Sequence, residues 1–220
     1  LTTGAGNLAL GYHAMQVHTT GANNIAIGYQ AMDDTDAGST SLGSQANIFI
    51  GSQAGGGTWT DADSSYNVGI GSFVMDSALA GSQQNVAIGH YALSSVTTSD
   101  GNVAVGANSA YALTTGANNV AIGSAALQVH TTGARNIAIG YGAMNDTDAG
   151  STSLGSSDNI FMGYDAGGGT WTNVVSSHNI GIGNYTLDAA LDGALKNIAI
   201  GHEALTDLTT GDNSIAIGYG

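Results

Sequence analysis

The stretch Asn24-Ile25-Ala26-Ile27-Gly28 decides the fold, because its order of Asn, apolar, small, apolar and Gly recurs along the chain. Side chains alternate between the two faces of a β-strand, so Ile25 and Ile27 share one face and Ala26 lies on the other. β-Branched residues suit a pleated, half-buried surface. Gly28 permits the positive φ of a tight corner. The stretch therefore predicts a short strand followed by a sharp turn.

The same five-residue core occurs twelve times, and Asn opens every copy except the last, where Ser214 replaces it. The closing residues are Gly11, Gly28, Gly51, Gly71, Gly89, Gly106, Gly123, Gly140, Gly163, Gly183, Gly201 and Gly218. Successive glycines lie 17 to 23 residues apart, and the order of these intervals repeats after 112 residues. We therefore predict a single repetitive domain over residues 1–220, with one super-repeat at 1–112 and a second, truncated one at 113–220.

Each core is followed by an apolar pair such as Ala31-Met32, which predicts a second short strand, and then by a return turn such as Thr19-Thr20-Gly21. One coil has too little apolar surface to fold alone, so successive coils have to stack over a shared core. No window shows the apolar spacing that indicates a helix. The predicted fold class is all-β, a parallel β-solenoid of twelve coils. The Asn at each corner predicts a ladder in which its amide bonds backbone groups that the bend leaves free.

The middle position of the core is also apolar, although a strand face in contact with water would carry polar residues there. Phe49 is followed one coil later by Gly69, which indicates that the large residue fills space that its neighbour vacates. Two apolar faces on one strand predict a partner sheet, most simply from another copy of the same chain. The residues predicted to face that partner are Ala26, Phe49, Gly69, Ala87, Ala138, Phe161, Gly181 and Ala199.

The composition excludes several classes of partner. The chain has 35 Gly, no Pro, no Cys and a formal net charge of −14, and Arg135 and Lys196 are its only Arg and Lys residues. Such an acidic surface repels phosphate backbones and anionic lipid, so we predict no nucleic-acid partner. No apolar run approaches the ~20 residues of a membrane span, so we predict no direct membrane insertion. The chain begins within a repeat, at Leu1-Thr2-Thr3-Gly4, and we expect it to be an excerpt of a longer polypeptide.

Two stretches carry a family resemblance, Asn24-Ile25-Ala26-Ile27-Gly28-Tyr29-Gln30-Ala31-Met32 and Asn85-Val86-Ala87-Ile88-Gly89-His90-Tyr91-Ala92-Leu93. They resemble the head repeats of trimeric autotransporter adhesins and the related repeats of bacteriophage tail fibres. The resemblance implies a left-handed parallel β-roll, a homotrimer wound about a common axis, and an extracellular role in attachment on a virion fibre or a bacterial cell surface. The coils of this chain are longer than the adhesin repeat, and the 112-residue super-repeat departs from the family pattern.

The longer coils carry candidate binding residues, because loops on a rigid scaffold commonly bind ligands. Trp59 follows a run of three glycines, and Trp171 occupies the corresponding place in the second super-repeat. A flat aromatic ring with polar groups around it suits a sugar, so Trp59, Trp171 and Tyr66 are predicted to contact a host-surface glycan. The alternative is that each Trp covers the edge of the core beneath its loop.

Metal ligands are a second possibility for these loops. The run from Asp33 to Asp36 offers carboxylates to Ca²⁺, but its spacing is not that of an EF-hand and Asn145 replaces Asp33 in the second super-repeat. Solvated acidic turns are the favoured interpretation. The six histidines include two pairs that are equivalent between the super-repeats, His18 with His130 and His90 with His202. None has a second His or Cys at ligand spacing, so we predict no metal site and no cofactor, with Ca²⁺ as the one ion that the Asp runs could hold.

No nucleophile has a base and an orienting group at a plausible spacing, so the chain is predicted not to be an enzyme. The predicted function is a structural and adhesive segment of an extracellular trimeric fibre. One alternative is a subunit of a self-assembling extracellular filament, built by end-to-end stacking of exposed coils. A further alternative is an ice-binding solenoid in which Thr pairs such as Thr19-Thr20 line a flat face, although that row is broken in the longer coils.

Overall fold

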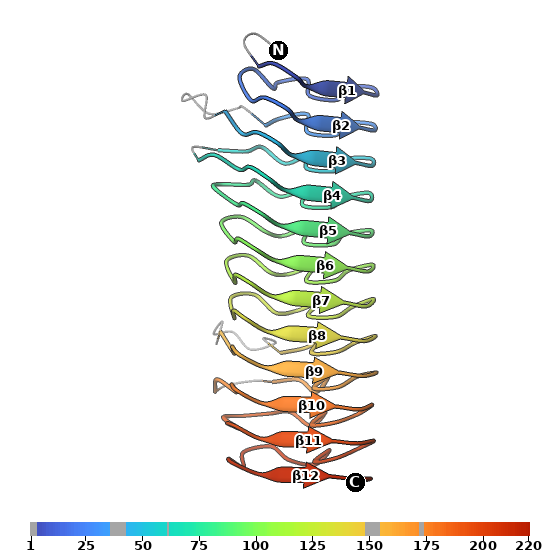
Figure 1. Ribbon diagram of the computed structural model, residues 1–220, viewed down its shortest axis with the longest axis vertical. Coiled ribbons are helices and arrows are strands. Elements are labelled where there is room, and N and C mark those ends of the chain that lie inside the picture. The colour runs from blue at the N-terminus through green and yellow to red at the C-terminus, as the bar shows by residue number, and fades with distance from the viewer. Residues whose placement is uncertain (1–3, 36–42, 61, 148–154, 172–173) are drawn as a thin grey trace.

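The computed structural model describes residues 4–35, 43–60, 62–147, 155–171 and 174–220. Over these residues the chain forms one sheet of twelve parallel strands in chain order (Figure 1). The strands are β1 (Leu8–Leu10), β2 (Ile25–Ile27), β3 (Ile48–Ile50), β4 (Val68–Ile70), β5 (Val86–Ile88), β6 (Val103–Val105), β7 (Val120–Ile122), β8 (Ile137–Ile139), β9 (Ile160–Met162), β10 (Ile180–Ile182), β11 (Ile198–Ile200) and β12 (Ile215–Ile217). No helix occurs in the described ranges, and the predicted all-β parallel solenoid is confirmed.

The pairing register repeats the sequence motif from coil to coil. Ala26 stands beside Phe49, although 23 residues separate them in the sequence. Val103 pairs with Val120, so the sheet runs without a break from residues 1–112 into residues 113–220. Coils of different length keep this register because their additional residues lie outside the strands.

A ladder of buried asparagines joins each coil to the next. The backbone N–H and the Nδ2 of Asn102 both donate to Oδ1 of Asn85, at 2.9 and 3.1 Å. Oδ1 of Asn102 in turn accepts the same two bonds from Asn119. The predicted ladder is confirmed, since Nδ2 also reaches a backbone carbonyl, as Asn24 does at Ser44 at 2.9 Å. The buried members are Asn24, Asn47, Asn67, Asn85, Asn102, Asn119, Asn136, Asn159, Asn179 and Asn197.

The corner at the end of each strand requires glycine. Gly28 has a φ of 139°, and a Cβ there would lie 2.2 Å from the carbonyl oxygen of Gly51 in the next coil. After the corner, Gln30 and Met32 have left-handed φ values of 52° and 50°. The apolar pair after the core, predicted as a second strand, is therefore a run of turns; that prediction is wrong because positive φ at alternate residues bends the chain. The turns still stack, since Met32 N–H donates to the Ala54 carbonyl at 3.0 Å.

The core is the narrow space between each strand and the turns that return beneath it. The Phe49 ring fills space that two glycines leave, because a Cβ would lie 2.9 Å from the ring at Gly55 and 2.5 Å from it at Gly69. The second super-repeat repeats this arrangement with Phe161, Gly167 and Gly181. The predicted fit between each Phe and the Gly of the following coil is confirmed.

We expect Gly69→Ala and Phe49→Ala each to destabilise the fold and to compensate one another. The added methyl overpacks against the ring at a cost of about 1–3 kcal/mol. Loss of the ring leaves a cavity that costs about 3–5 kcal/mol. Because the methyl would occupy part of that cavity, the double variant is expected to lose less unfolding free energy than the sum. Denaturant unfolding of the four proteins measures the coupling, and strictly additive losses would contradict this packing.

Asn102→Ala is expected to lower the urea midpoint. It leaves the backbone N–H and Nδ2 of Asn119 without their buried acceptor, and an unsatisfied buried group costs about 1–3 kcal/mol. The matched control is Gln128→Ala, which shortens a partly exposed polar side chain outside the ladder. Equal midpoints for the two variants would show that the ladder does not stabilise the stack.

Candidate functional site

The eight residues predicted to face a partner chain lie inside this chain's own core. Ala26, Phe49, Ala87, Ala138, Phe161 and Ala199 are 0% exposed, and Gly69 and Gly181 are buried. A side chain without accessible surface cannot contact a partner, so this prediction is wrong. The small face points inward because the returning turns pass too close beneath the strand to leave room for Ile.

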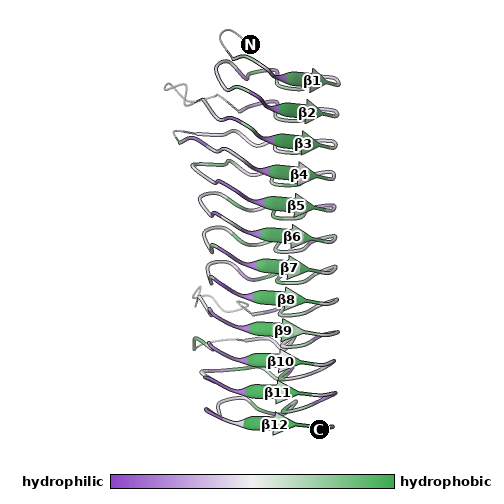
Figure 2. Ribbon diagram, in the orientation of Figure 1, coloured by the Kyte–Doolittle hydropathy of each residue, from purple (hydrophilic) through white to green (hydrophobic). Residues whose placement is uncertain are grey.

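The opposite face of the sheet, which we call the outer face, is apolar at every described strand. It consists of the first and third residues of β1 to β12, all of which are Ile, Val, Leu or Met. Ile88, Ile122 and Ile182 are 39%, 39% and 40% exposed. Figure 2 shows the hydrophobic strands as one unbroken column. At the usual strand spacing the column is about 53 Å long. Large contiguous apolar surfaces of this kind mark interaction sites.

The two residues after each closing glycine form the trailing edge of the outer face, and aromatic rings gather there. Ring centroids are 5.2 Å apart for Tyr141 and Tyr164, 5.4 Å for Tyr164 and Tyr185, 5.8 Å for Tyr185 and His202, and 5.5 Å for His202 and Tyr219. The Asp165 carboxylate raises the pKa of Tyr164. Shorter rows join Tyr12 to Tyr29 and Phe73 to Tyr91. The sequence predictions do not include this edge, although aromatic residues directly after the glycines signal it.

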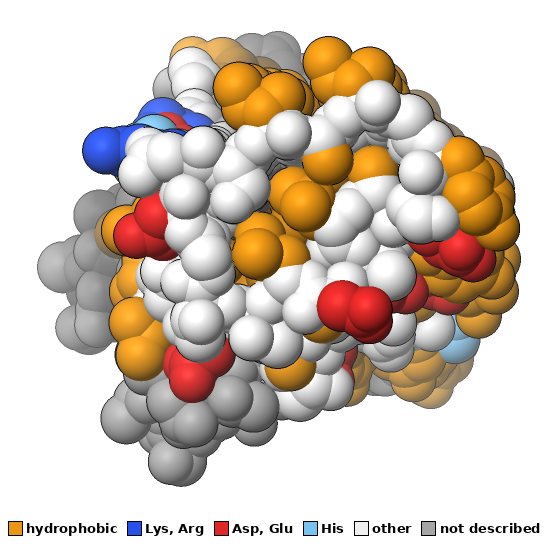
Figure 3. Space-filling view, turned by 90° about the horizontal axis from the view of Figure 1, so that it is seen from below, with side chains coloured by type: hydrophobic (Ala, Val, Ile, Leu, Met, Phe, Trp, Pro, Cys, Tyr) orange, Lys and Arg blue, Asp and Glu red, His pale blue; other side chains and the backbone are white. Residues whose placement is uncertain are grey.

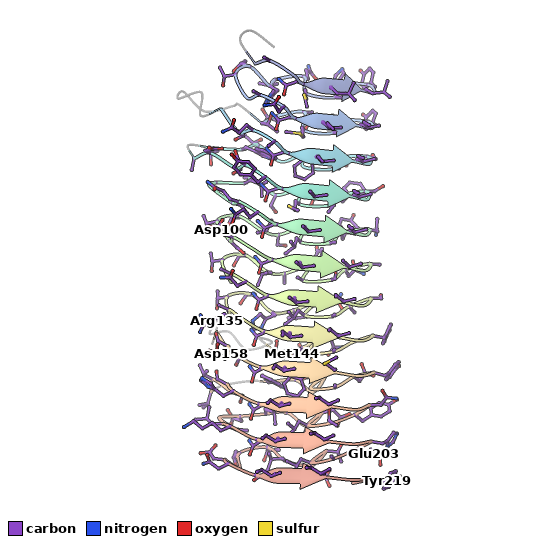
Figure 4. All side chains as sticks on the ribbon, in the orientation of Figure 1. Asp100, Arg135, Met144, Asp158, Glu203 and Tyr219 are labelled. Carbon is purple, nitrogen blue, oxygen red and sulfur yellow. The ribbon has the colours of Figure 1, made fainter. Side chains whose placement is uncertain are left out.

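The residue before each Asn forms the leading edge, on the side of the sheet where the strands begin (Figure 4). Here Arg135 forms a bidentate salt bridge with Asp158, with Nε at 2.6 Å from Oδ1 and Nη2 at 2.8 Å from Oδ2. The hydrogen bond from Arg135 lowers the pKa of Asp158. His178 and Lys196 follow along the edge, which therefore holds both of the chain's Lys and Arg residues. Figure 3 shows these cations gathered at one corner of the cross-section, beside the hydrophobic columns.

The two tryptophans are core residues. Trp59 and Trp171 are each 2% exposed. Their rings make edge-on contacts with Phe49 and Phe161, with centroids 5.8 Å apart in both cases. A sugar needs an accessible ring face, so the predicted glycan contact through these tryptophans is wrong. The alternative, that each Trp covers the edge of the core, is confirmed.

Tyr66 is exposed and lies on the leading edge, where its φ is 63°. No ring contact joins Tyr66 to Trp59 among the described residues. The structure therefore does not bring the three predicted glycan residues into one surface.

Metal ligands do not converge in the described part of the chain, where no group of three or more His, Cys, Asp or Glu could hold an ion. Asp36 of the run that begins at Asp33, and Asp148 at the equivalent position of the second super-repeat, lie outside the described residues. His18 and His130 are buried, with Nδ1 at 2.7 Å from Oγ1 of Thr35 and 2.8 Å from Oγ1 of Thr147. Both histidines are thus parts of the polar interior.

Asp76 is a partly buried acidic residue directly after a turn, and its burial can be tested through the pH dependence of stability. It accepts a hydrogen bond from the Ser94 hydroxyl at 2.5 Å, and burial raises its pKa above the ordinary 3.8. The folded state thus favours the protonated carboxyl, and that contribution to stability is lost as the pH rises through the raised pKa. Asp76→Asn keeps an acceptor for Ser94, so we expect a higher urea midpoint at pH 7 and no gain well below pH 3.8.

The control for that experiment is Asp207→Asn, which removes the same charge from an exposed site. An equal gain at pH 7 in both variants would attribute the effect to net charge and would contradict a role for burial at Asp76.

No helix long and apolar enough to cross a membrane occurs among the described residues. Comparison of the chain with protein-family models, curated proteins and solved structures finds no match. The resemblance to adhesin-head and tail-fibre repeats stays a prediction.

Proposed function

We propose that the chain is a structural and adhesive segment of an extracellular fibre, in which three copies lie side by side with their outer faces against one another. The observation that carries the proposal is the outer face. The stack already has its own interior, built mainly of Ala, Met, Leu, Phe and Trp side chains, and the Ile and Val columns of the outer face lie outside it. Burying them requires another molecule, and burial of apolar surface is the main driving force for association.

A second copy of the same chain fits this face better than an unrelated partner. The face is straight and repeats at the strand spacing, so only a surface with the same spacing matches it over its whole length. Another copy supplies that spacing at every coil. In a closed ring of identical chains, every copy also has its outer face buried at the same time. Three copies about a common axis, with the left-handed winding of the adhesin-head repeats, is the arrangement that the sequence resemblance favours.

A rod of this kind suits attachment. Its stiffness comes from the continuous hydrogen-bonded stack, and coils of different length keep the same strand register, so the loops can vary without disturbing the strands. The formal charge of −14 keeps assembled rods apart in solution.

The first test is the mass of the isolated chain by light scattering. We expect three times 21.8 kDa for the unaltered protein and 21.8 kDa for Ile88→Asp/Ile122→Asp, because two carboxylates on the outer face would have to be buried without partners. Thr115→Asp, an exposed turn residue, is the matched control and is expected to leave the trimer intact.

A monomeric unaltered chain would overturn the proposal. Very large polymers would favour the alternative of a self-assembling filament. Circular dichroism of the Ile88→Asp/Ile122→Asp variant establishes that it keeps the solenoid, so that loss of assembly is separated from loss of fold.

A further inference from the structure

The geometry points to a contact between the two edges of neighbouring copies: the trailing edge of one copy packs against the leading edge of the next at the same coil. This inference rests on the side-by-side assembly proposed above and specifies its register. When flat faces close around an axis along the rod, each copy presents its trailing edge to the leading edge of its neighbour.

Long side chains occur on the leading edge only in coils that carry a ring on the trailing edge. Three coils carry no ring on the trailing edge, and their leading residues are short, namely Ala46, Gly101 and Asn118. Five coils carry a long side chain on the leading edge and a ring on the trailing edge, namely Tyr66 with Phe73, Gln84 with Tyr91, Arg135 with Tyr141, His178 with Tyr185, and Lys196 with His202. In the remaining four, the short residues Gly6, Asn23, Asp158 and Asn213 stand opposite Tyr12, Tyr29, Tyr164 and Tyr219. Every long side chain on the leading edge therefore has an aromatic ring opposite it on the trailing edge.

Contact within one chain does not explain this match. The two edges of a coil are separated by the whole strand, from the residue before the Asn to the residue after the Gly, a span of roughly 15–20 Å at the usual rise. Side chains on opposite edges of one copy therefore do not touch. Contact between copies brings them together.

Charge supplies a second match in the coil of β11. In the coil of β9, where Asp158 and Asp165 stand on opposite edges, Arg135 of the same chain already pairs with Asp158. Glu203 is the chain's only Glu, and Lys196 is its only Lys. Both belong to the coil of β11 and lie on opposite edges. Lys196 is exposed and forms no ion pair within the described part of its own chain, and Glu203 contacts His202 at 3.6 Å. In the edge contact the Lys196 ammonium of one copy meets the Glu203 carboxylate of the next, and complementary charges at an interface fix its register.

The cationic side chains of the leading edge can also interact favourably with the aromatic rings of the trailing edge. Arg135 stands at the level of Tyr141, and a guanidinium beside an aromatic face gains a cation–π attraction. The same rings are less well suited to binding a sugar than to packing against a neighbouring copy. Tyr141 and Tyr164 lie 5.2 Å apart with an interplanar angle of 14°, so each ring leans over the next and covers part of the face that a sugar would need.

The test uses engineered disulfides, because the chain has no Cys of its own. Lys196→Cys/Glu203→Cys places one thiol on each edge of the same coil. The two thiols of one copy are too far apart to bond, since a disulfide needs Cα atoms within roughly 7 Å. Mild oxidation is therefore expected to link neighbouring copies into a closed covalent trimer on a non-reducing gel.

The matched control is Lys196→Cys/Asp165→Cys, which moves the second thiol two coils along the same edge, by about 10 Å. We expect at least about ten-fold less cross-linking in the control, because that offset exceeds disulfide geometry. A covalent product that stops at two chains would support the edge contact but would correct the number of copies.

Two outcomes separate this inference from the proposed function. If both variants are trimers by light scattering but the control links as well as the same-coil pair, the edge register is wrong and the trimeric fibre stands. If the unaltered chain is a monomer, both the edge contact and the trimeric fibre are wrong. As a second measurement, Lys196→Glu is expected to weaken assembly and Lys196→Glu/Glu203→Lys to restore it; failure of the exchange to restore assembly would overturn the ion pair.

Discussion

The rest of the structure depends on the hydrogen bonds that each buried Asn makes to the coil before it. Oδ1 of one Asn takes both the backbone N–H and the amide of the next, so the corner that opens every strand is fixed relative to its neighbour. Because this corner is invariant, loops of different length can be inserted elsewhere without shifting the strand register. The same regularity makes the rod straight and places equivalent side chains in columns. Any partner that binds the surface of the rod therefore contacts these columns.

The narrowness of the coil explains the unusual distribution of side chains. The turns pass directly beneath the strand, so only small residues fit inward, and Phe49 is accommodated only because Gly55 and Gly69 leave space for it. The large apolar residues are consequently displaced to the outer face. A strand that is apolar on both faces is complete only beside another molecule, which links the packing of the single chain to our proposal of a fibre.

Much of the fold follows from the sequence, because the spacing of Asn and Gly specifies where each strand begins and ends. The assignment of the two strand faces does not, since alternation shows that Ile25 and Ile27 share a face but not that this face points outward. The sequence leaves two positions open for Trp59, a glycan-binding surface and the edge of the core, because a loop's length does not reveal how its side chains fold back. The aromatic row becomes evident only in the stack, where residues 17 to 23 positions apart lie side by side, although the rings that follow many of the closing glycines signal it in the sequence.

Small-angle X-ray scattering of the isolated chain measures whether copies associate side by side through their outer faces. Side-by-side association widens the rod without lengthening it, so we expect a particle about 53 Å long with a cross-section larger than that of one solenoid. A particle with the cross-section of a single solenoid, whether of unit length or a multiple of it, would exclude side-by-side association.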